Sequence, residues 1–161
     1  MPLASLPPPP LRLFLDAGVI IDGCYNSWGF SKSALILATL RRNYRIVLAE
    51  PIEVEVMREV LFRQQGLTPA EAYAVATPYA GWLQRVKVER IPWPTQAQTT
   101  EYSHLLPIIR HINDMPSVVA AALAQPDVVL STNTRHWNKA LVTATGLFIT
   151  TPMDFAERLH L

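Results

Sequence analysis

The stretch from Leu11 to Asp22, LRLFLDAGVIID, places an acidic residue between two apolar runs. Residues 13–15 have the length and apolarity of a buried strand, and residues 19–21 form the second run. Asp16 lies between them, where a charge is unfavourable unless it binds a cation or hydrogen-bond donors. We interpret the stretch as a strand ending at Asp16, followed by a short glycine-containing turn. Because ligands bind at the carboxyl ends of strands in open α/β sheets, Asp16 is predicted to mark an active-site cleft.

The composition is that of an ordinary globular protein. Of the 161 residues, 50% are hydrophobic and 17% are charged, and the formal net charge of +1 gives no general attraction to nucleic acid. The single cysteine, Cys24, cannot form an internal disulfide and fits a reducing compartment. No apolar run approaches the ~20 residues that span a bilayer, and the first residues lack a signal-peptide pattern. We therefore expect a cytoplasmic protein without membrane contact.

Prolines divide the chain into two parts. Pro7–Pro10 are consecutive, so residues 1–10 are predicted to form a stiff proline-rich leader. Residues 11–161 are predicted to form a single domain, because their length suits one hydrophobic core.

Strands and helices are expected to alternate along this domain. The pattern predicts a three-layer α/β/α sandwich with a central, mainly parallel, twisted sheet of four or five strands. The expected strands cover residues 12–15, 45–49, 87–91, 127–131 and 147–150.

Helix signals fill the intervals between these strands. Residues 22–30 are expected to be a loop, and Ser31 or Ser33 to cap a helix that reaches residue 43. A capping box at Thr68 opens another helix, which Pro78 is expected to break or kink. A helix is also predicted over residues 98–110.

Four acidic residues stand where an α/β cleft can use them. Asp16 follows the first strand, Glu53 and Glu55 lie on the helix after the second strand, and Asp114 precedes a small-residue helix. Carboxylates far apart in sequence but gathered by the fold suit Mg²⁺, which takes oxygen ligands. Each residue except Asp16 also has an ordinary structural interpretation: Asp114 as a helix cap, and the glutamates as solvated positions. Asp22 is an additional acid in the expected loop.

Four segments in this order resemble a PIN domain, a family of small α/β nucleases that includes VapC-type toxins. They are LRLFLDAGVIIDG, VLAEPIEVEVMREVL, NDMPSVVAAALAQPDVVLSTNTRHW and GLFITTPMDF. The resemblance implies a PIN-like fold and a metal-dependent endoribonuclease that uses Mg²⁺ or Mn²⁺. It also implies single-stranded or looped RNA as substrate, and it suggests an antitoxin protein and a second copy of the chain as partners.

The resemblance also assigns roles to particular residues. Asp16, Glu55 and Asp114 fall on the family's catalytic and metal-binding acids, and Glu53 remains an alternative to Glu55. The fourth acid falls on Asn133, which can offer only a carbonyl oxygen to the metal. The acids act on a phosphate, so they do not distinguish RNA from DNA.

The substitution at Asn133 leaves a second hypothesis open. The chain is then a degenerate PIN-like domain that binds RNA or a protein partner without cleaving. Arg135 and His136 follow the expected cleft strand and either contact a phosphate or serve local packing, and Trp137 is expected to pack against the sheet. Cys24 is expected to be a packing residue, with a nucleophile as the alternative.

Overall fold

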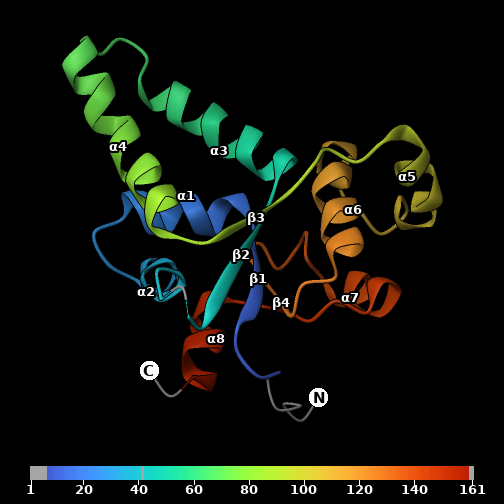
Figure 1. Cartoon of the computed structure of the whole chain (residues 1–161). Helices are drawn as coiled ribbons and strands as arrows, with labels where there is room; N and C mark the ends of the chain where they lie inside the picture. The colour runs from blue at the N-terminus through green and yellow to red at the C-terminus, as the bar shows by residue number, and fades with distance from the viewer. Residues whose placement is uncertain (1–6, 41, 160–161) are drawn as a thin grey trace.

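Parallel strands form the centre of the molecule (Figure 1). The computed structural model describes residues 7–40 and 42–159, and these include one five-stranded sheet with the order β3–β2–β1–β4–β5. Every neighbouring pair of strands is parallel, which confirms the predicted sheet. The strands are β1 (Leu11–Leu15), β2 (Tyr44–Ala49), β3 (Val88–Ile91), β4 (Val128–Leu130) and β5 (Ile149–Thr150).

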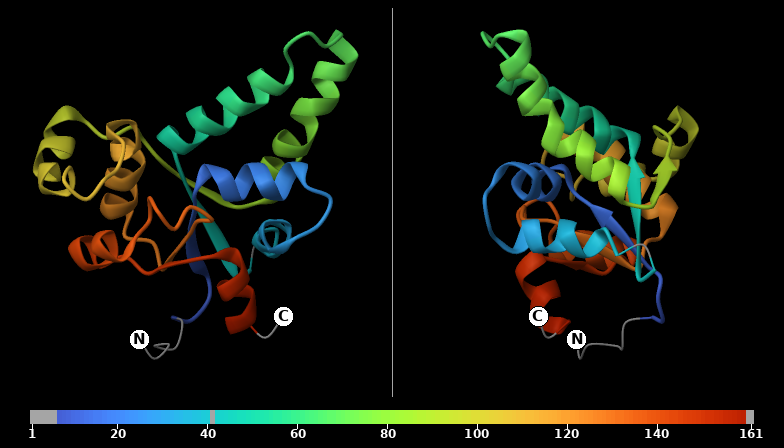
Figure 2. Two further views of the ribbon diagram at one scale, coloured as in Figure 1. Left: turned by 180° about the vertical axis from the view of Figure 1, so that it is seen from behind. Right: turned by 60° about the vertical axis from the view of Figure 1, so that its left-hand side comes forward.

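Helices cover both faces of this sheet (Figures 1 and 2). Helices α1, α2 and α8 lie on one face, and α5, α6 and α7 lie on the other, so the expected three layers are present. Helices α3 and α4 extend away from the sheet as a hairpin. The helices are α1 (Ala17–Tyr25), α2 (Phe30–Ala38), α3 (Glu50–Arg63), α4 (Pro69–Arg85), α5 (Gln96–Glu101), α6 (Met115–Ala124), α7 (Lys139–Thr145) and α8 (Pro152–Arg158).

The three central strands are buried on both faces. Leu13, Ile46 and Val129 each have 0% exposure. Strands covered on both sides read as continuous apolar runs without alternation, and this explains why their positions were predictable from composition alone. The central strands β1 and β4 also end side by side, because the backbone N–H of Asp16 donates to the carbonyl of Leu130 at 2.9 Å.

The segment after β1 differs from the prediction. No turn follows Asp16; helix α1 begins directly at Ala17 and runs to Tyr25, so only residues 26–29 remain of the loop expected over 22–30. Buried Val19 and Ile20 belong to this helix and not to an extended run. Their burial against the sheet outweighs the weak helix propensity of β-branched residues.

Other helix boundaries also need correction. Helix α2 begins after Gly29 without a side-chain cap, so neither Ser31 nor Ser33 caps it. Helix α4 has the predicted capping box at Thr68, but it continues through Pro78 without a break. The helix expected over 98–110 ends at Glu101 and is followed by a 3₁₀ turn.

The predicted leader is only partly described. Residues 1–6 lie outside the described residues, and Pro7–Pro10 are exposed and precede β1. Among the helices of the described residues, none is both long and apolar enough to cross a membrane.

Candidate functional site

Asp16 lies at the carboxyl end of the central strand β1. Its Oδ1 accepts the backbone N–H of Ala17 at 3.0 Å, so it caps α1. Its Oδ2 accepts the hydroxyl of Ser131 at 2.8 Å. Burial raises the pKa of Asp16, while the hydrogen bonds from Ser131 and Ala17 act in the opposite direction. Asp16 is therefore a half-buried carboxyl group that accepts hydrogen bonds from two donors, and its apolar flanks in the sequence indicated such a position.

Glu55 and Asp114 approach Asp16 from two other elements. Glu55 lies on α3, and its pKa is raised by desolvation and then by the charges of Asp16 and Asp114. Asp114 immediately precedes α6, but its side chain makes no capping hydrogen bond. Its Oδ2 instead lies 3.2 Å from Nδ1 of His136. The three acids therefore interact electrostatically across one region, and the helix-cap interpretation of Asp114 does not describe its side chain.

Glu53 faces another way. Its carboxylate forms an ion pair with Arg90 on β3. The two glutamates are two residues apart on α3, so a helix of 3.6 residues per turn directs them roughly 200° apart. The structure thus places Glu55, and not Glu53, beside the other acids.

The segment that follows β4 is a compact turn organised by Asn133. The backbone N–H of Asn133 donates to Ser131 Oγ at 3.0 Å, and its Oδ1 accepts the backbone N–H of His136 at 3.2 Å. The carbonyl of Asn133 also accepts the N–H of Trp137 at 3.0 Å. This turn, residues 131–137, connects Asp16 through Ser131 with Asp114 through His136.

The sequence placed Ser131 at the same edge of the sheet as Asp16 but assigned no role to its side chain, and it underestimated His136. Both are buried, at 2% and 8% exposure, although they are polar. A signal for Ser131 was available, because a polar residue directly follows a buried strand that was expected at the same sheet edge as Asp16. Trp137 packs as predicted, with its ring centroid 6.0 Å from that of Phe14.

Asp22 and Cys24, two other residues considered from the sequence, both lie on α1. Asp22 belongs to α1, where its carboxylate accepts the side-chain amide of Asn26. Cys24 is half-buried, and desolvation raises its pKa to about 11, so its thiol stays protonated at neutral pH. This protonation supports the packing role of Cys24 and not the nucleophile.

A cleft of about 410 Å³ opens beside Asp114. Its walls come from the segment before α6 and from the turn after β4. Among residues 7–40 and 42–159, no three acidic, histidine or cysteine side chains are grouped closely enough to hold a metal ion directly. The residues that line the cleft are Arg110, His111, Asp114, Asn133, Arg135 and His136.

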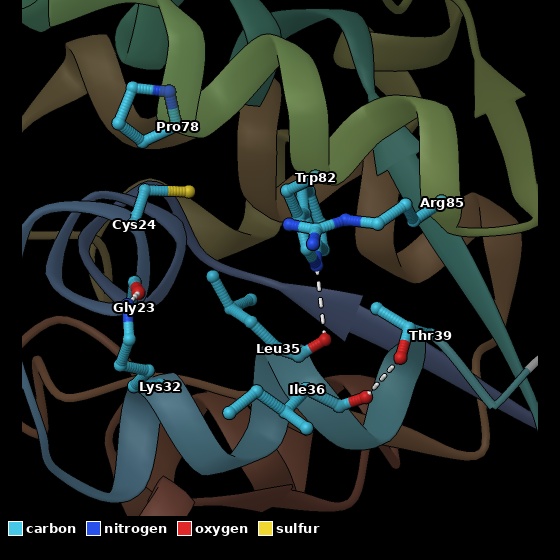
Figure 3. A pocket seen from close by; sticks show the side chains of 9 residues that line it. All are labelled: Gly23, Cys24, Lys32, Leu35, Ile36, Thr39, Pro78, Trp82 and Arg85. Carbon is cyan, nitrogen blue, oxygen red and sulfur yellow. Dashed lines mark hydrogen bonds between the residues drawn. The ribbon is translucent and has the colours of Figure 1, made fainter.

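A second cavity, of about 220 Å³, lies between α1, α2 and α4 (Figure 3). The indole of Trp82 donates to the carbonyl of Leu35 at 3.1 Å, and Thr39 donates to the carbonyl of Ile36 at 2.6 Å. Cys24 and Lys32 complete part of its wall. None of the predicted site residues lines this cavity.

Comparisons with known proteins give matches in structure. No family model and no curated protein matches the sequence. The structure is similar to a chain of VapBC2 from Rickettsia felis bound to a DNA fragment from their promoter, with 14% identity, a TM-score of 0.62 and coverage of 88% of this chain and 98% of that chain. A chain of DNA-bound VapBC from Salmonella typhimurium has 20% identity, a TM-score of 0.60 and coverage of 88% and 98%.

An archaeal structure extends the likeness over more of the chain. PAE2754 from Pyrobaculum aerophilum covers 96% of this chain and 98% of its own, with 11% identity and a TM-score of 0.59. The chain has the PIN-domain fold. At these identities the likeness concerns the fold, so the roles of residues in this PIN-domain fold rest on their own geometry.

Proposed function

We propose that this chain is a metal-dependent endoribonuclease of the PIN type. The observation that carries the proposal is the raised pKa of Glu55, which results first from desolvation and then from the charges of Asp16 and Asp114. The Glu55 carboxylate on α3 is therefore repelled by one carboxylate at the end of β1 and by another that precedes α6. Such repulsion is unfavourable for the fold alone, and a bound divalent cation removes it. An arrangement that destabilises the empty protein fits a site selected for cation binding.

The donor set fits Mg²⁺ or Mn²⁺. Both ions prefer oxygen ligands, and Mg²⁺ keeps several of its waters. Because the described residues contain no group of three close enough for direct ligation, Asp16, Glu55 and Asp114 would hold the ion partly through its waters. When bound, the ion supplies positive charge beside the phosphate and lowers the pKa of water. Asn133 would be an auxiliary ligand through the second lone pair of Oδ1, since the first accepts the His136 N–H.

The chain's own side chains contribute orientation and charge. Ser131 and the Ala17 N–H keep the Asp16 carboxylate directed at the sheet edge. Nδ1 of His136 lies beside the Asp114 carboxylate, and both residues line the cleft. Cleavage requires an exposed backbone, so single-stranded or looped RNA is the proposed substrate.

A cleavage assay with a matched acidic control tests this proposal. Purified protein should cleave a single-stranded RNA with Mn²⁺ or Mg²⁺, and EDTA should stop the reaction. Asp114→Asn should reduce the rate at least about 100-fold without lowering the melting temperature, because it removes a carboxylate that would hold the cation. Glu157→Gln on α8 also removes one carboxylate and should leave the rate unchanged. Calorimetry that detects no Mn²⁺ binding at millimolar concentration would contradict the proposal, and cleavage of the matching DNA alone would reassign the substrate.

We also propose that the protein acts as the toxin of a toxin–antitoxin pair. The support is the likeness in fold to chains of VapBC complexes. An antitoxin segment would then block the cleft beside Asp114, and the active protein would be a homodimer. Co-expression with the product of an adjacent small reading frame should suppress the ribonuclease activity. Light scattering should give twice the mass of the chain, and a monomer with full activity would contradict the dimer.

A degenerate domain is the second candidate. It is favoured by Asn133, which carries no charge and already accepts a backbone N–H. In that case the protein binds RNA without metal-dependent cleavage. Binding that persists in EDTA, together with no cleavage at any metal concentration, would favour this candidate over the nuclease.

A further inference from the structure

Two arginines face the cleft beside Asp114 without any partner in the described part of the chain. Arg110 comes from the segment before α6 and Arg135 from the turn after β4, and both are exposed. No hydrogen bond or ion pair joins either guanidinium to residues 7–40 or 42–159. Their side chains are thus available to a ligand that enters the cleft.

Three other arginines of the chain are paired with carboxylates. Arg12 pairs with Glu89 at 2.8 Å, Arg63 pairs with Glu59 at 3.0 Å, and Arg90 pairs with Glu53. Arg110 and Arg135 line the same cleft as the Asp114 carboxylate, yet that carboxylate faces His136. Of the three acids, Asp114 lines this cleft, and because its carboxylate lies beside His136, the two guanidinium groups remain for an anion.

We propose that Arg110 and Arg135 form a phosphate subsite that binds a phosphodiester adjacent to the one beside the acids. This inference rests on the proposed nuclease function, and it identifies the substrate as a strand with at least one further phosphate on this side of the cleft. A guanidinium presents paired N–H donors that match two phosphate oxygens. Two such groups that line one cleft can bind one phosphate together. His111, on the same wall as Arg110, adds a third group that can donate to it.

The subsite explains how a chain with a net charge of only +1 can bind a polyanion. Nucleic-acid affinity usually comes from clustered cations, and global charge gives little here. Unpaired arginines concentrated at one cleft provide that attraction locally. They also position the strand over the acids, because the two walls of the cleft come from the segments that carry Asp114 and Asn133.

Binding should be measured in the Asp16→Asn background, in EDTA, so that no cleavage occurs. The probe is a labelled single-stranded RNA of about eight nucleotides, within the range of single-stranded binding sites. Arg110→Gln and Arg135→Gln should each weaken binding roughly tenfold and reduce the salt slope by about 0.7. Arg135→Lys should retain the salt slope but lose part of the affinity, since a lysine keeps the charge without the paired donors.

The matched control is Arg42→Gln. Arg42 is exposed and precedes β2, at the amino end of the sheet and opposite to the cleft. The Arg42→Gln variant removes one positive charge and should leave both the RNA affinity and the salt slope unchanged. Equal losses in all three glutamine variants, or none in the two cleft variants, would overturn the subsite.

A second comparison separates the subsite from the nuclease. If the protein cleaves RNA, the two cleft variants should raise KM about tenfold for the oligonucleotide and leave the rate on a dinucleoside monophosphate unchanged. Arginine-dependent binding without any cleavage would support the subsite and contradict the nuclease. Cleavage with KM unaffected by either arginine would support the nuclease and contradict the subsite.

Discussion

Glu53 and Glu55 illustrate how far the choice of a single residue depends on orientation. Both follow the second strand at nearly the same distance, and the resemblance to PIN domains allowed either. The structure separates them by their partners: Glu53 meets Arg90, and Glu55 meets the charges of Asp16 and Asp114. A shift of two positions on a helix changes the face, and sequence spacing alone did not define which face met the cleft.

This difference predicts opposite outcomes for two similar variants. Glu55→Gln should reduce metal-dependent cleavage at least about 100-fold, because it removes a charge that faces the proposed ion. Glu53→Gln should retain the rate and lower stability by less than about 1 kcal/mol, since its ion pair with Arg90 is partly exposed. Rates with saturating Mn²⁺ and urea unfolding measure the two effects. The assignment fails if Glu53→Gln is the variant that loses activity.

The residues of the candidate site were predictable to different degrees. Asp16 was identifiable because apolar neighbours flank it on both sides, and a charge in such a run needs a reason. A role for the Ser131 side chain was not identified, because its importance comes from its 2.8 Å hydrogen bond to Asp16, which is 115 positions away. That contact depends on β1 and β4 being neighbours, and strand order is not encoded in any local pattern.

At the scale of elements, the turn of residues 131–137 acts as one unit. Asn133 bonds to both ends of it, so the turn's geometry depends on a carbonyl oxygen at this side chain. Asn133→Ala should therefore destabilise the protein by about 1 kcal/mol, the usual loss when a side chain stops accepting a backbone N–H. It should also reduce cleavage, because Ser131 in this turn donates to Asp16 and His136 lies beside Asp114.

The variant Asn133→Asp tests whether position 133 contacts the proposed ion. An aspartate keeps the acceptor oxygen, so the turn should persist. Its added charge should increase Mn²⁺ affinity several-fold by calorimetry, since oxygen ligands with charge bind divalent cations more tightly. Unchanged affinity would mean that Asn133 supports the turn and lies away from the ion.

The success of prediction also varied among elements. The central strands were recognised because burial on both faces leaves uninterrupted apolar runs. Helix α1 was missed because its sequence, AGVIIDGCY, contains two glycines and several β-branched residues, which locally favour other conformations. Gly23 has a packing reason to be there, since a Cβ at that position would lie 2.4 Å from a side-chain carbon of Leu35 on α2. Tertiary contacts, which a local pattern does not contain, therefore decide this helix.

At the scale of the whole molecule, the buried strands of the sheet stabilise the fold. The desolvated carboxylates at the carboxyl ends of these strands destabilise it. The pKa of Asp16 is raised above its ordinary value of 3.8, mainly by burial, and the pKa of Glu55 is raised in the same direction. In the pH range between the ordinary and the raised values, the folded state holds more protons than the unfolded state. The free energy of unfolding therefore decreases, through these two groups, as the pH rises through that window.

Asp16→Asn should remove this penalty. An asparagine still caps α1 and cannot ionise, so the variant should melt a few degrees above the parent protein at pH 7 in EDTA, about 2–4 °C for each kcal/mol recovered. The difference between the two proteins should shrink as the pH falls through the raised pKa of Asp16 toward 3.8, because the parent's carboxyl group takes up its proton in that range. Other groups such as Glu89, whose pKa is lowered by Arg12, titrate equally in both proteins and cancel in the difference. Thermal melts from pH 4 to 7 test this, and a stability difference independent of pH would show that burial of the Asp16 charge does not limit the stability of the fold.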